Sequence, residues 1–187
     1  IQKQNGEISA PLGVLEAFAE LKSNEKIYIA KGRAVLSKSV ELENLNNIQI
    51  IGEGTSLIVK DDIPVLSFSD VSNVQLQGVL VVHEIGDNCM QNCVEIYNAT
   101  NIVVQDCKLD GSGYIGLSLW KVYNATITNN QFYNCEYGVS IYDCSNLMAK
   151  DNTFSENREE DISGKLTQFT NDVKADNIFQ TEAIPPR

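Results

Sequence analysis

Histidine is scarce in this sequence, which holds a single one, His83, among 187 residues. One histidine supplies neither a zinc site nor a Ser-His-Asp triad. Long apolar runs are missing too, and no stretch is long enough to span a bilayer. Basic residues are too few to balance the acidic ones, so the formal net charge is −11. These shortages argue against a transmembrane segment and against nucleic acid or anionic membranes as main partners.

The cysteines form neither a CxxC motif nor an even set. They are Cys89, Cys93, Cys107, Cys135 and Cys144. Four of them fall within repeat units, where a small buried residue suits a stacked core. We therefore expect mostly free structural thiols. A Cys89–Cys93 bridge, or some other single disulfide, is the alternative.

The chain begins at Ile1 rather than at a methionine. We accordingly expect that an N-terminal segment has been removed. This leads us to expect an exported bacterial protein, secreted, periplasmic or at the cell surface. The length is enough for one domain with a sizeable core, and we assign residues 1–187 to it.

One sequence pattern occurs three times between residues 97 and 157. An aromatic residue stands four positions before an asparagine, and Asn or Asp follows five positions after that asparagine. Asn101, Asn124 and Asn146 are the three asparagines, 23 and 22 residues apart. A repeat of this length is typical of a solenoid, in which each unit stacks on its neighbour.

Five repeat units, or rungs, align when one asparagine of each is set as position zero. These are Asn47, Asn73, Asn101, Asn124 and Asn146. Positions −7, −5, +1, +3 and +8 are predominantly apolar and alternate with polar residues, so we expect them to point inward. Position +5 holds only Gly, Asn or Asp, which predicts a left-handed bend.

Each rung thus has three short strands and about 22 residues, and equivalent strands pair in parallel. The pattern predicts an all-β, single-stranded parallel β-helix of five to six rungs. A β-sandwich, the alternative for short, evenly spaced strands, does not explain five superposable rungs.

The two ends of the chain lack the repeat pattern of its middle. Residues 9–23 are expected to form an N-terminal capping helix, with Ser9 or Ala10 as its cap, Pro11 in the first turn and its end at Asn24. Its apolar face would comprise Val14, Ala17, Phe18 and Leu21. Rungs would cover residues 26–157. A C-terminal cap and tail, residues 158–187, would close the far end with Phe169, Val173, Ile178 and Phe179.

Two stretches, Lys-Ile-Tyr-Ile-Ala-Lys-Gly at 26–32 and Asn-Ile-Gln-Ile-Ile-Gly-Glu-Gly at 47–54, carry a family resemblance. Over residues 12–157 the chain resembles the pectate-lyase-like superfamily of right-handed parallel β-helix proteins. The resemblance implies a right-handed coil. It also implies a substrate groove floored by the outward face of the strand before position zero.

The catalytic motifs of these relatives do not carry over. The sequence has no Asn-Thr-Asp, His-Gly or Arg-Ile-Lys, which polygalacturonases contain, and no Asp-Pro-His-Asp, which alginate epimerases contain. Arg33, Arg158 and Arg187 all lie outside the regular rungs, so none is placed as the arginine base of a lyase. Fold alone does not fix activity, and whether the protein is an enzyme stays open at this point.

Position −4 places one aromatic ring per rung on the outward strand face, from Tyr97, Trp120 and Tyr142. Flat exposed rings along a groove can hold the apolar faces of sugars. The alternative is an aromatic ladder that only stabilises the sheet. The candidate substrate-binding residues are Tyr97, Trp120, Tyr142, Glu95, Tyr114 and His83.

The candidate catalytic residues are Lys121, Asp143 and Asp110. Lys121 would sit beside Asp143 of the next rung. Burial would make this lysine a base, whereas exposure would leave it half of a surface ion pair. Asp110 could join Asp143 or Glu136 as an acid–base pair for glycoside hydrolysis.

The long turns after position +8 carry acidic residues that we expect on one side of the coil. Asp61, Asp62, Glu84 and Asp87 are a candidate Ca²⁺ site, although no cofactor is required. A solvated acidic edge is the alternative reading.

Together these observations predict a monomeric, exported, polysaccharide-binding β-helix. Its groove would lie over the aromatic row and beside acidic turns. A polysaccharide lyase or glycoside hydrolase acting on uronate-type polymers is the first alternative. A structural or adhesion module without a glycan ligand is the second.

Overall fold

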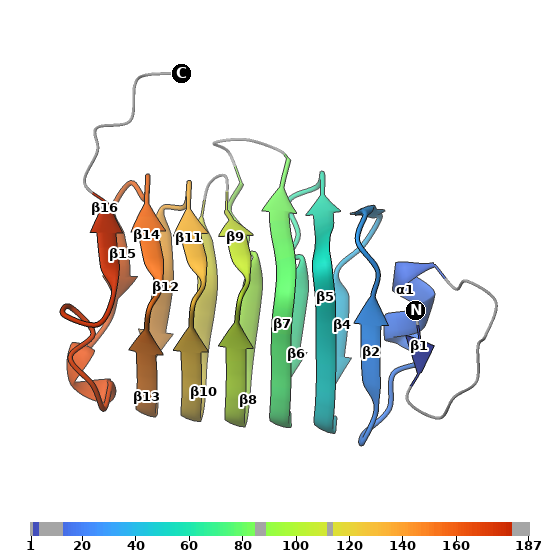
Figure 1. Ribbon diagram of the computed structural model, residues 1–187, viewed down its shortest axis with the longest axis horizontal. Coiled ribbons are helices and arrows are strands. Elements are labelled where there is room, and N and C mark those ends of the chain that lie inside the picture. Colours follow the sequence, from blue (N-terminus) through green and yellow to red (C-terminus); the bar gives the residue numbers. More distant parts are fainter. Residues whose placement is uncertain (1, 4–12, 85–88, 112–113, 181–187) are drawn as a thin grey trace.

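The computed structural model describes residues 2–3, 13–84, 89–111 and 114–180. Nearly all regular structure is β, and the strands form a coil in which each rung stacks on the next (Figure 1). Its only α-helix in the described residues, α1 (Val14–Ala19), lies at the N-terminal end. None of the described helices is long and apolar enough to cross a membrane.

Sheet A carries the strand that precedes position zero of each rung. It consists of β4 (Val40–Glu43), β6 (Leu66–Ser69), the first part of β8 (Val94–Gln105), the first part of β10 (Ile115–Thr128), β12 (Tyr137–Tyr142) and β15 (Glu160–Ser163). All of these neighbours pair in parallel, in the register Val40, Leu66, Val94, Leu117, Val139 and Ile162.

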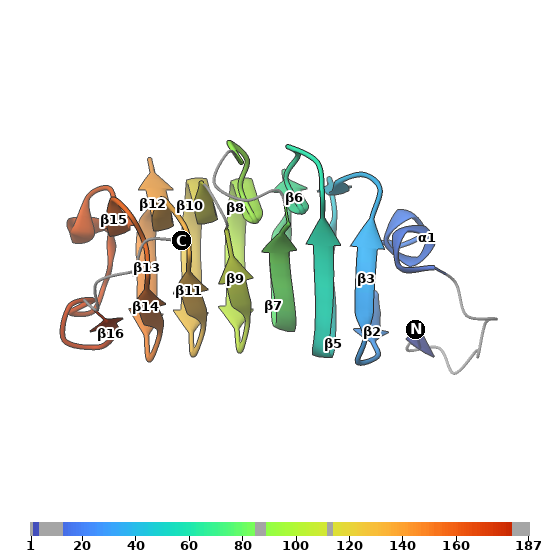
Figure 2. The same ribbon diagram turned by 90° about the horizontal axis from the view of Figure 1, so that it is seen from above.

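Sheets B and C form the other two faces of the coil. Sheet B consists of β2 (Lys26–Ile29), β5 (Asn46–Val59), β7 (Ser72–His83), β8, β10 and β13 (Ser145–Lys150). Sheet C consists of β3 (Arg33–Leu36), the ends of β5 and β7, β9 (Lys108–Asp110), β11 (Gln131–Tyr133), β14 (Thr153–Ser155) and β16 (Ile178–Gln180). Figure 2 shows the same stack from above.

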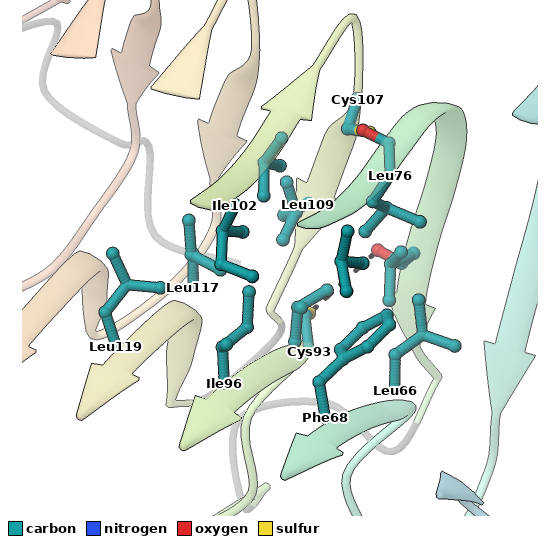
Figure 3. Packing of buried hydrophobic residues seen from close by; sticks show 14 of the residues in the cluster. Leu66, Phe68, Leu76, Cys93, Ile96, Ile102, Cys107, Leu109, Leu117 and Leu119 are labelled. Carbon is teal, nitrogen blue, oxygen red and sulfur yellow. Dashed lines mark hydrogen bonds between the residues drawn. The ribbon is translucent and has the colours of Figure 1, made fainter. Parts of the chain in front are cut away.

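The core runs through the middle of the coil, as the alignment of rungs predicts. Every residue assigned to positions −7, −5, +1, +3 and +8 is at most 4% exposed. Figure 3 shows Leu66, Phe68, Ile96 and Leu117 packed inside the coil. Because each rung buries only one layer, burial is completed by the next rung.

Left-handed backbone shapes the corners. The position-zero asparagines have φ of 53° to 60°, and their side chains form an outer ladder with steps of 2.7 to 3.0 Å. Position +5 is also left-handed at Gly78, Asp106, Asn129 and Asp151. The expectation fails at Gly52, because the register shifts between Ile51 and Thr55 and Gly54 takes the bend instead.

A second, buried asparagine ladder follows the +5 bend. Asn130, Asn152 and Asn177 are 1%, 0% and 9% exposed. Asn130 Nδ2 donates to Asn152 Oδ1 at 3.0 Å, and Asn152 Nδ2 donates to Asn177 Oδ1 at 2.8 Å. Each amide also bonds to the backbone of the preceding rung. The ladder therefore satisfies polar groups inside the coil.

The N-terminal helix is shorter than expected. Six residues form α1, and Gly13 is its N-cap; the expected cap at Ser9, Ala10 and Pro11 lies outside the described residues. The N–H of Leu21 donates to the carbonyl of Phe18, a tight bond typical of a helix end. Asn24 does not end the helix, since it is left-handed and starts the outer ladder. Ala17, Phe18 and Leu21 are buried as predicted.

Two strand edges close the ends of the stack. At the N-terminal end β1 (Gln2–Lys3) pairs antiparallel with β2, which covers an open edge. At the other end the coil continues beyond residue 157, because β15 pairs with β12 and β16 pairs with β14. Residues 160–180 are therefore one more rung rather than a separate cap. Phe169 and Val173 are buried in it, as predicted, whereas Ile178 is 58% exposed, against the expectation.

All five cysteines carry free thiols and are buried, which agrees with the expectation of structural thiols. Burial raises the pKa of Cys107 to about 11 and that of Cys135 to about 12. These thiols therefore stay protonated and weakly nucleophilic. Figure 3 shows Cys93 and Cys107 within the core.

Candidate functional site

An aromatic row crosses the outer face of sheet A. Tyr97, Trp120 and Tyr142 are in register on neighbouring strands β8, β10 and β12. Their side chains are 44%, 48% and 63% exposed. The ring centroids of Tyr97 and Trp120 lie 6.1 Å apart and those of Trp120 and Tyr142 lie 5.0 Å apart, both edge to face. The rings support one another and still present open surface to solvent.

The row lines a groove of about 510 Å³. The lining residues are Asn92, Glu95, Ile96, Tyr97, Tyr114, Ile115, Ser118, Leu119, Trp120, Ser140 and Tyr142. Five of the six candidate substrate-binding residues are among them. The groove thus spans three rungs and follows the stacking direction of the coil.

Polar groups lie beside the rings in the same groove. Glu95, Ser118 and Ser140 occupy position −6, two residues before the aromatic row, and they are in register. Ser67 Oγ donates to Glu95 Oε1 at 2.8 Å, and Asn92 Nδ2 donates to Glu95 Oε2 at 3.0 Å. These bonds hold the carboxylate in place.

Three polar residues of the groove lining are missing from the set predicted from the sequence, namely Asn92, Ser118 and Ser140. The serines could have been found, because position −6 faces outward in every rung. Asn92 could not, because it sits in the long turn before β8, whose path does not follow from the repeat. Tyr114 precedes β10 at the same edge, with its ring 6.4 Å from that of Tyr137.

Position −3 proves to be a corner of the coil. Asp70, Asn98, Lys121 and Asp143 all have left-handed φ, between 49° and 53° or, for Lys121, 55°. This bend turns the chain from sheet A into sheet B, so the position is set by backbone geometry. Asn and Asp tolerate such a backbone, whereas lysine adopts it rarely.

The three candidate catalytic residues do not come together. Lys121 and Asp143 are exposed, and no ion pair joins them among those of the described residues. Lys121 Nζ lies instead 5.9 Å from the centre of the Tyr97 ring. Asp110 ends β9 on sheet C, whereas Lys121 stands at the corner between sheets A and B. Of the two alternatives for Lys121, the structure shows the exposed one, without the ion pair to Asp143.

Asp110 belongs to a hydrogen-bonded cluster at the turn. Asn134 Nδ2 donates to Asp110 Oδ1 at 2.8 Å. Burial, with the charge and hydrogen bond of Asp110, raises the pKa of Tyr133 to about 12. In this arrangement the carboxylate of Asp110 helps to hold the turns of neighbouring rungs together.

His83 lies inside the protein, away from the groove surface. Its side chain is buried, with Nε2 2.8 Å from the carbonyl oxygen of Ile63 and Nδ1 3.7 Å from Cys93 Sγ. Burial lowers its pKa, so the ring is neutral at physiological pH. The expectation of a ligand-binding histidine is corrected here, because His83 ends β7 with its side chain on the inward face.

Two of the four candidate Ca²⁺ residues, Glu84 and Asp62, have other partners. Glu84 pairs with Arg33, and its carboxylate lies 3.7 Å from Lys60 Nζ; the hydrogen bond from Arg33 holds the pKa of Glu84 below its usual value. Asp62 Oδ1 accepts the N–H of Met90 at 2.9 Å. Asp61 is exposed, and Asp87 lies outside the described residues. No three acidic, His or Cys side chains converge as a metal site within the described part of the chain.

Comparisons with known proteins agree with this architecture. The family described as right handed beta helix region matches residues 68–181, more than half of the chain. A protein from Parabacteroides merdae provisionally described as a glycosyl hydrolase has a similar solved structure, with 12% identity and a TM-score of 0.61. The match covers 82% of this chain and 80% of that one.

A second solved structure, ORF18 of Geobacillus virus E2, matches with 16% identity and a TM-score of 0.58. The match covers 78% of this chain and 35% of the viral chain. At these identities both likenesses concern the fold. A search of curated proteins gives no significant match.

Proposed function

We propose that this chain, which belongs to the right-handed β-helix family, is a carbohydrate-binding protein. Its binding site is the groove on sheet A. The observation that carries this proposal is the aromatic row. Three consecutive rungs each place a ring, 44% to 63% exposed, in one groove of about 510 Å³. The glycosyl hydrolase description of the similar Parabacteroides merdae structure supports a carbohydrate-related role.

The groove offers the two kinds of contact that a sugar needs. The rings of Tyr97, Trp120 and Tyr142 provide flat apolar surface for the C–H faces of sugar rings. The hydroxyls of Ser118 and Ser140, on the neighbouring row, can exchange hydrogen bonds with sugar hydroxyls. Because both rows stand on paired strands, little conformational freedom is lost on binding.

Binding is favoured over catalysis by the placement of the candidate acid and base groups. Lys121 is an exposed corner residue, and Asp110, at the end of β9, is hydrogen-bonded to Asn134. We therefore propose a binding protein rather than a lyase or hydrolase. A structural or adhesion role without a glycan is the outcome that the next experiment would favour if no sugar binds.

The test is a panel of soluble oligosaccharides and polysaccharides, measured by calorimetry against wild type and Trp120→Ala. Loss of an aromatic anchor at the groove centre should weaken binding by at least about tenfold. Tyr123→Ala is the matched control, since Tyr123 is 56% exposed but stands outside the groove lining. Equal affinities for wild type and Trp120→Ala on every ligand would contradict the proposal.

We also propose that the protein is exported and acts as a monomer. Cell fractionation and sedimentation would test these two predictions. Recovery of the protein in the cytoplasm, or a stable oligomer, would contradict them.

A further inference from the structure

We propose that the groove selects an uncharged glycan and discriminates against polyuronates. This inference rests on the proposed function and names the substrate class of the same site. It starts from the one carboxylate in the groove lining. Glu95 stands in the floor, two residues before Tyr97 on the same strand and in register with Ser118 beside Trp120.

Glu95 is held in a fixed orientation. Both of its carboxylate oxygens receive a hydrogen bond, Oε1 from Ser67 Oγ at 2.8 Å and Oε2 from Asn92 Nδ2 at 3.0 Å. Each oxygen keeps a further lone pair. A carboxylate fixed in this way is a strong acceptor for the hydroxyl groups of a sugar. It repels any ligand carboxylate that takes the same place.

The remaining polar groups of the lining carry no charge. They are the hydroxyls of Ser118 and Ser140, the amide of Asn92 and the phenol groups of the tyrosines. No lysine or arginine occurs in the groove lining formed by the described residues. The forked contact by which arginine binds a carboxylate therefore has no donor here.

Two lysines border the groove, and both have an acidic neighbour. Lys121 approaches the Tyr97 ring from the corner, and it follows Trp120 as Asp143 follows the paired Tyr142. Lys165 lines a separate depression beyond Tyr142, and Asp143 lines that depression as well. Asp143 therefore offsets part of the positive charge that these two lysines place beside the groove.

A polyuronate carries a carboxylate on every sugar ring, so every register along the groove brings negative charge into a site that already holds the charge of Glu95. One close pair of like charges should weaken binding by about tenfold. The protein charge of −11 adds a long-range repulsion of a polyanion. A Ca²⁺ bridge would need converging oxygen ligands, and the described residues provide no such cluster.

The experiment compares matched probes on the whole chain by calorimetry. Neutral oligosaccharides of glucose, xylose and galactose form one class. Oligogalacturonates form the other, with their methyl esters as probes that differ mainly in charge. All are measured with and without CaCl₂. We expect the tightest ligand to be neutral, and each methyl ester to bind about tenfold more tightly than its acid.

Glu95→Gln is the diagnostic variant, because it keeps the shape and removes the charge. The ratio of neutral to uronate affinity should fall by at least about tenfold. Uronates are no longer repelled by the charge of Glu95, and neutral sugars lose a charge-assisted hydrogen bond to it. Glu41→Gln is the matched control. Glu41 occupies the same row two rungs earlier, outside the groove lining, and its loss should leave the ratio unchanged.

A uronate as the tightest ligand would overturn this inference while the proposed function stands. The inference would also be overturned if Glu95→Gln and Glu41→Gln both fold and Glu95→Gln leaves the ratio of neutral to uronate affinity unchanged. If no sugar of either class binds, the proposed function itself fails, and the inference falls with it.

Discussion

The buried asparagine ladder gives a sharp prediction for the substitution Asn152→Ala. Asn152 is fully buried in the turn between β13 and β14. Its Oδ1 accepts the backbone N–H of Asn130 at 2.9 Å and Asn130 Nδ2 at 3.0 Å. Its Nδ2 donates to the carbonyl of Ile127 and to Asn177 Oδ1, both at 2.8 Å. Alanine would remove all four bonds at once.

The cost follows from which groups lose their partners. The N–H of Asn130 would be left buried without its acceptor, which costs about 2 kcal/mol, and the other lost bonds contribute about 1 kcal/mol each where no second partner remains. Asn130 Nδ2 keeps its bond to Val104, and Asn177 Oδ1 keeps the backbone N–H of Asn152. We therefore expect a loss of about 3 kcal/mol in the free energy of unfolding, from the N–H of Asn130 and the carbonyl of Ile127. In a protein of this size the melting temperature should fall by roughly 6 to 12 °C.

The assay is urea and thermal unfolding followed by circular dichroism. Asn46→Ala is the matched control, because Asn46 is exposed at the start of β5 and the same substitution there should change stability by less than about 0.5 kcal/mol. Equal stabilities for Asn152→Ala and Asn46→Ala would refute the reasoning. That result would mean that water or a backbone shift replaces the buried amide at no cost.

Three further predictions concern the corner, the histidine and the thiols. Lys121→Asn should raise the free energy of unfolding by roughly 0.5 kcal/mol, because relief of the left-handed lysine outweighs the lost contact with Tyr97; a clear loss of stability in thermal melts would contradict the corner assignment. The pKa of His83 is lowered by burial from 6.5, so the stability it contributes is complete above that pH and is lost as the pH falls through the folded-state pKa. Urea titrations at several pH values should show that His83→Gln makes the free energy of unfolding less dependent on pH, above the range in which carboxylates titrate. An unchanged dependence on pH would contradict this role of His83. All five thiols should be silent to Ellman's reagent in the native protein at pH 8 and react after unfolding, since burial raises their pKa values; rapid labelling of the folded protein would disagree.

The repeat pattern predicts the core because inward positions recur at fixed offsets from one asparagine. Position +8, for example, gives Phe132 and Phe154, whose rings stack with centroids 5.0 Å apart. The next member, Phe179, stacks on Phe154 at 5.1 Å. The sequence reads as a cap there, although Asn171 stands eight residues before Phe179, the spacing between position zero and position +8 in the other rungs. The coil therefore has more regularity than the alignment detects.

Other differences arise where one residue type serves two structural purposes. Asn130 and Asn152 share position +6. Asparagine is common beside a bend in any exposed turn, so the sequence alone does not predict their buried ladder. Lys121 holds a left-handed corner that its equivalents fill with Asp or Asn, and a lysine conceals that signal. It was therefore interpreted as a candidate base.

The candidate groove was largely predictable, because alternation along a strand fixes which side chains face outward. Tyr97, Trp120 and Tyr142 follow directly from this rule. The long turns follow no such rule, since their paths depend on contacts between rungs. His83 was assigned to the surface for this reason, although the end of β7 points it toward Ile63 and Cys93.

The central claim, that glycan binds over the aromatic row, is tested most directly by the fluorescence of Trp120. It is the one tryptophan in the sequence, it is 48% exposed, and it lines the groove. Titration with the tightest glycan of the panel should shift its emission to the blue and protect it from acrylamide, with a saturation curve that matches calorimetry. A glycan that binds by calorimetry and leaves both the emission and the quenching of Trp120 unchanged would contradict the account.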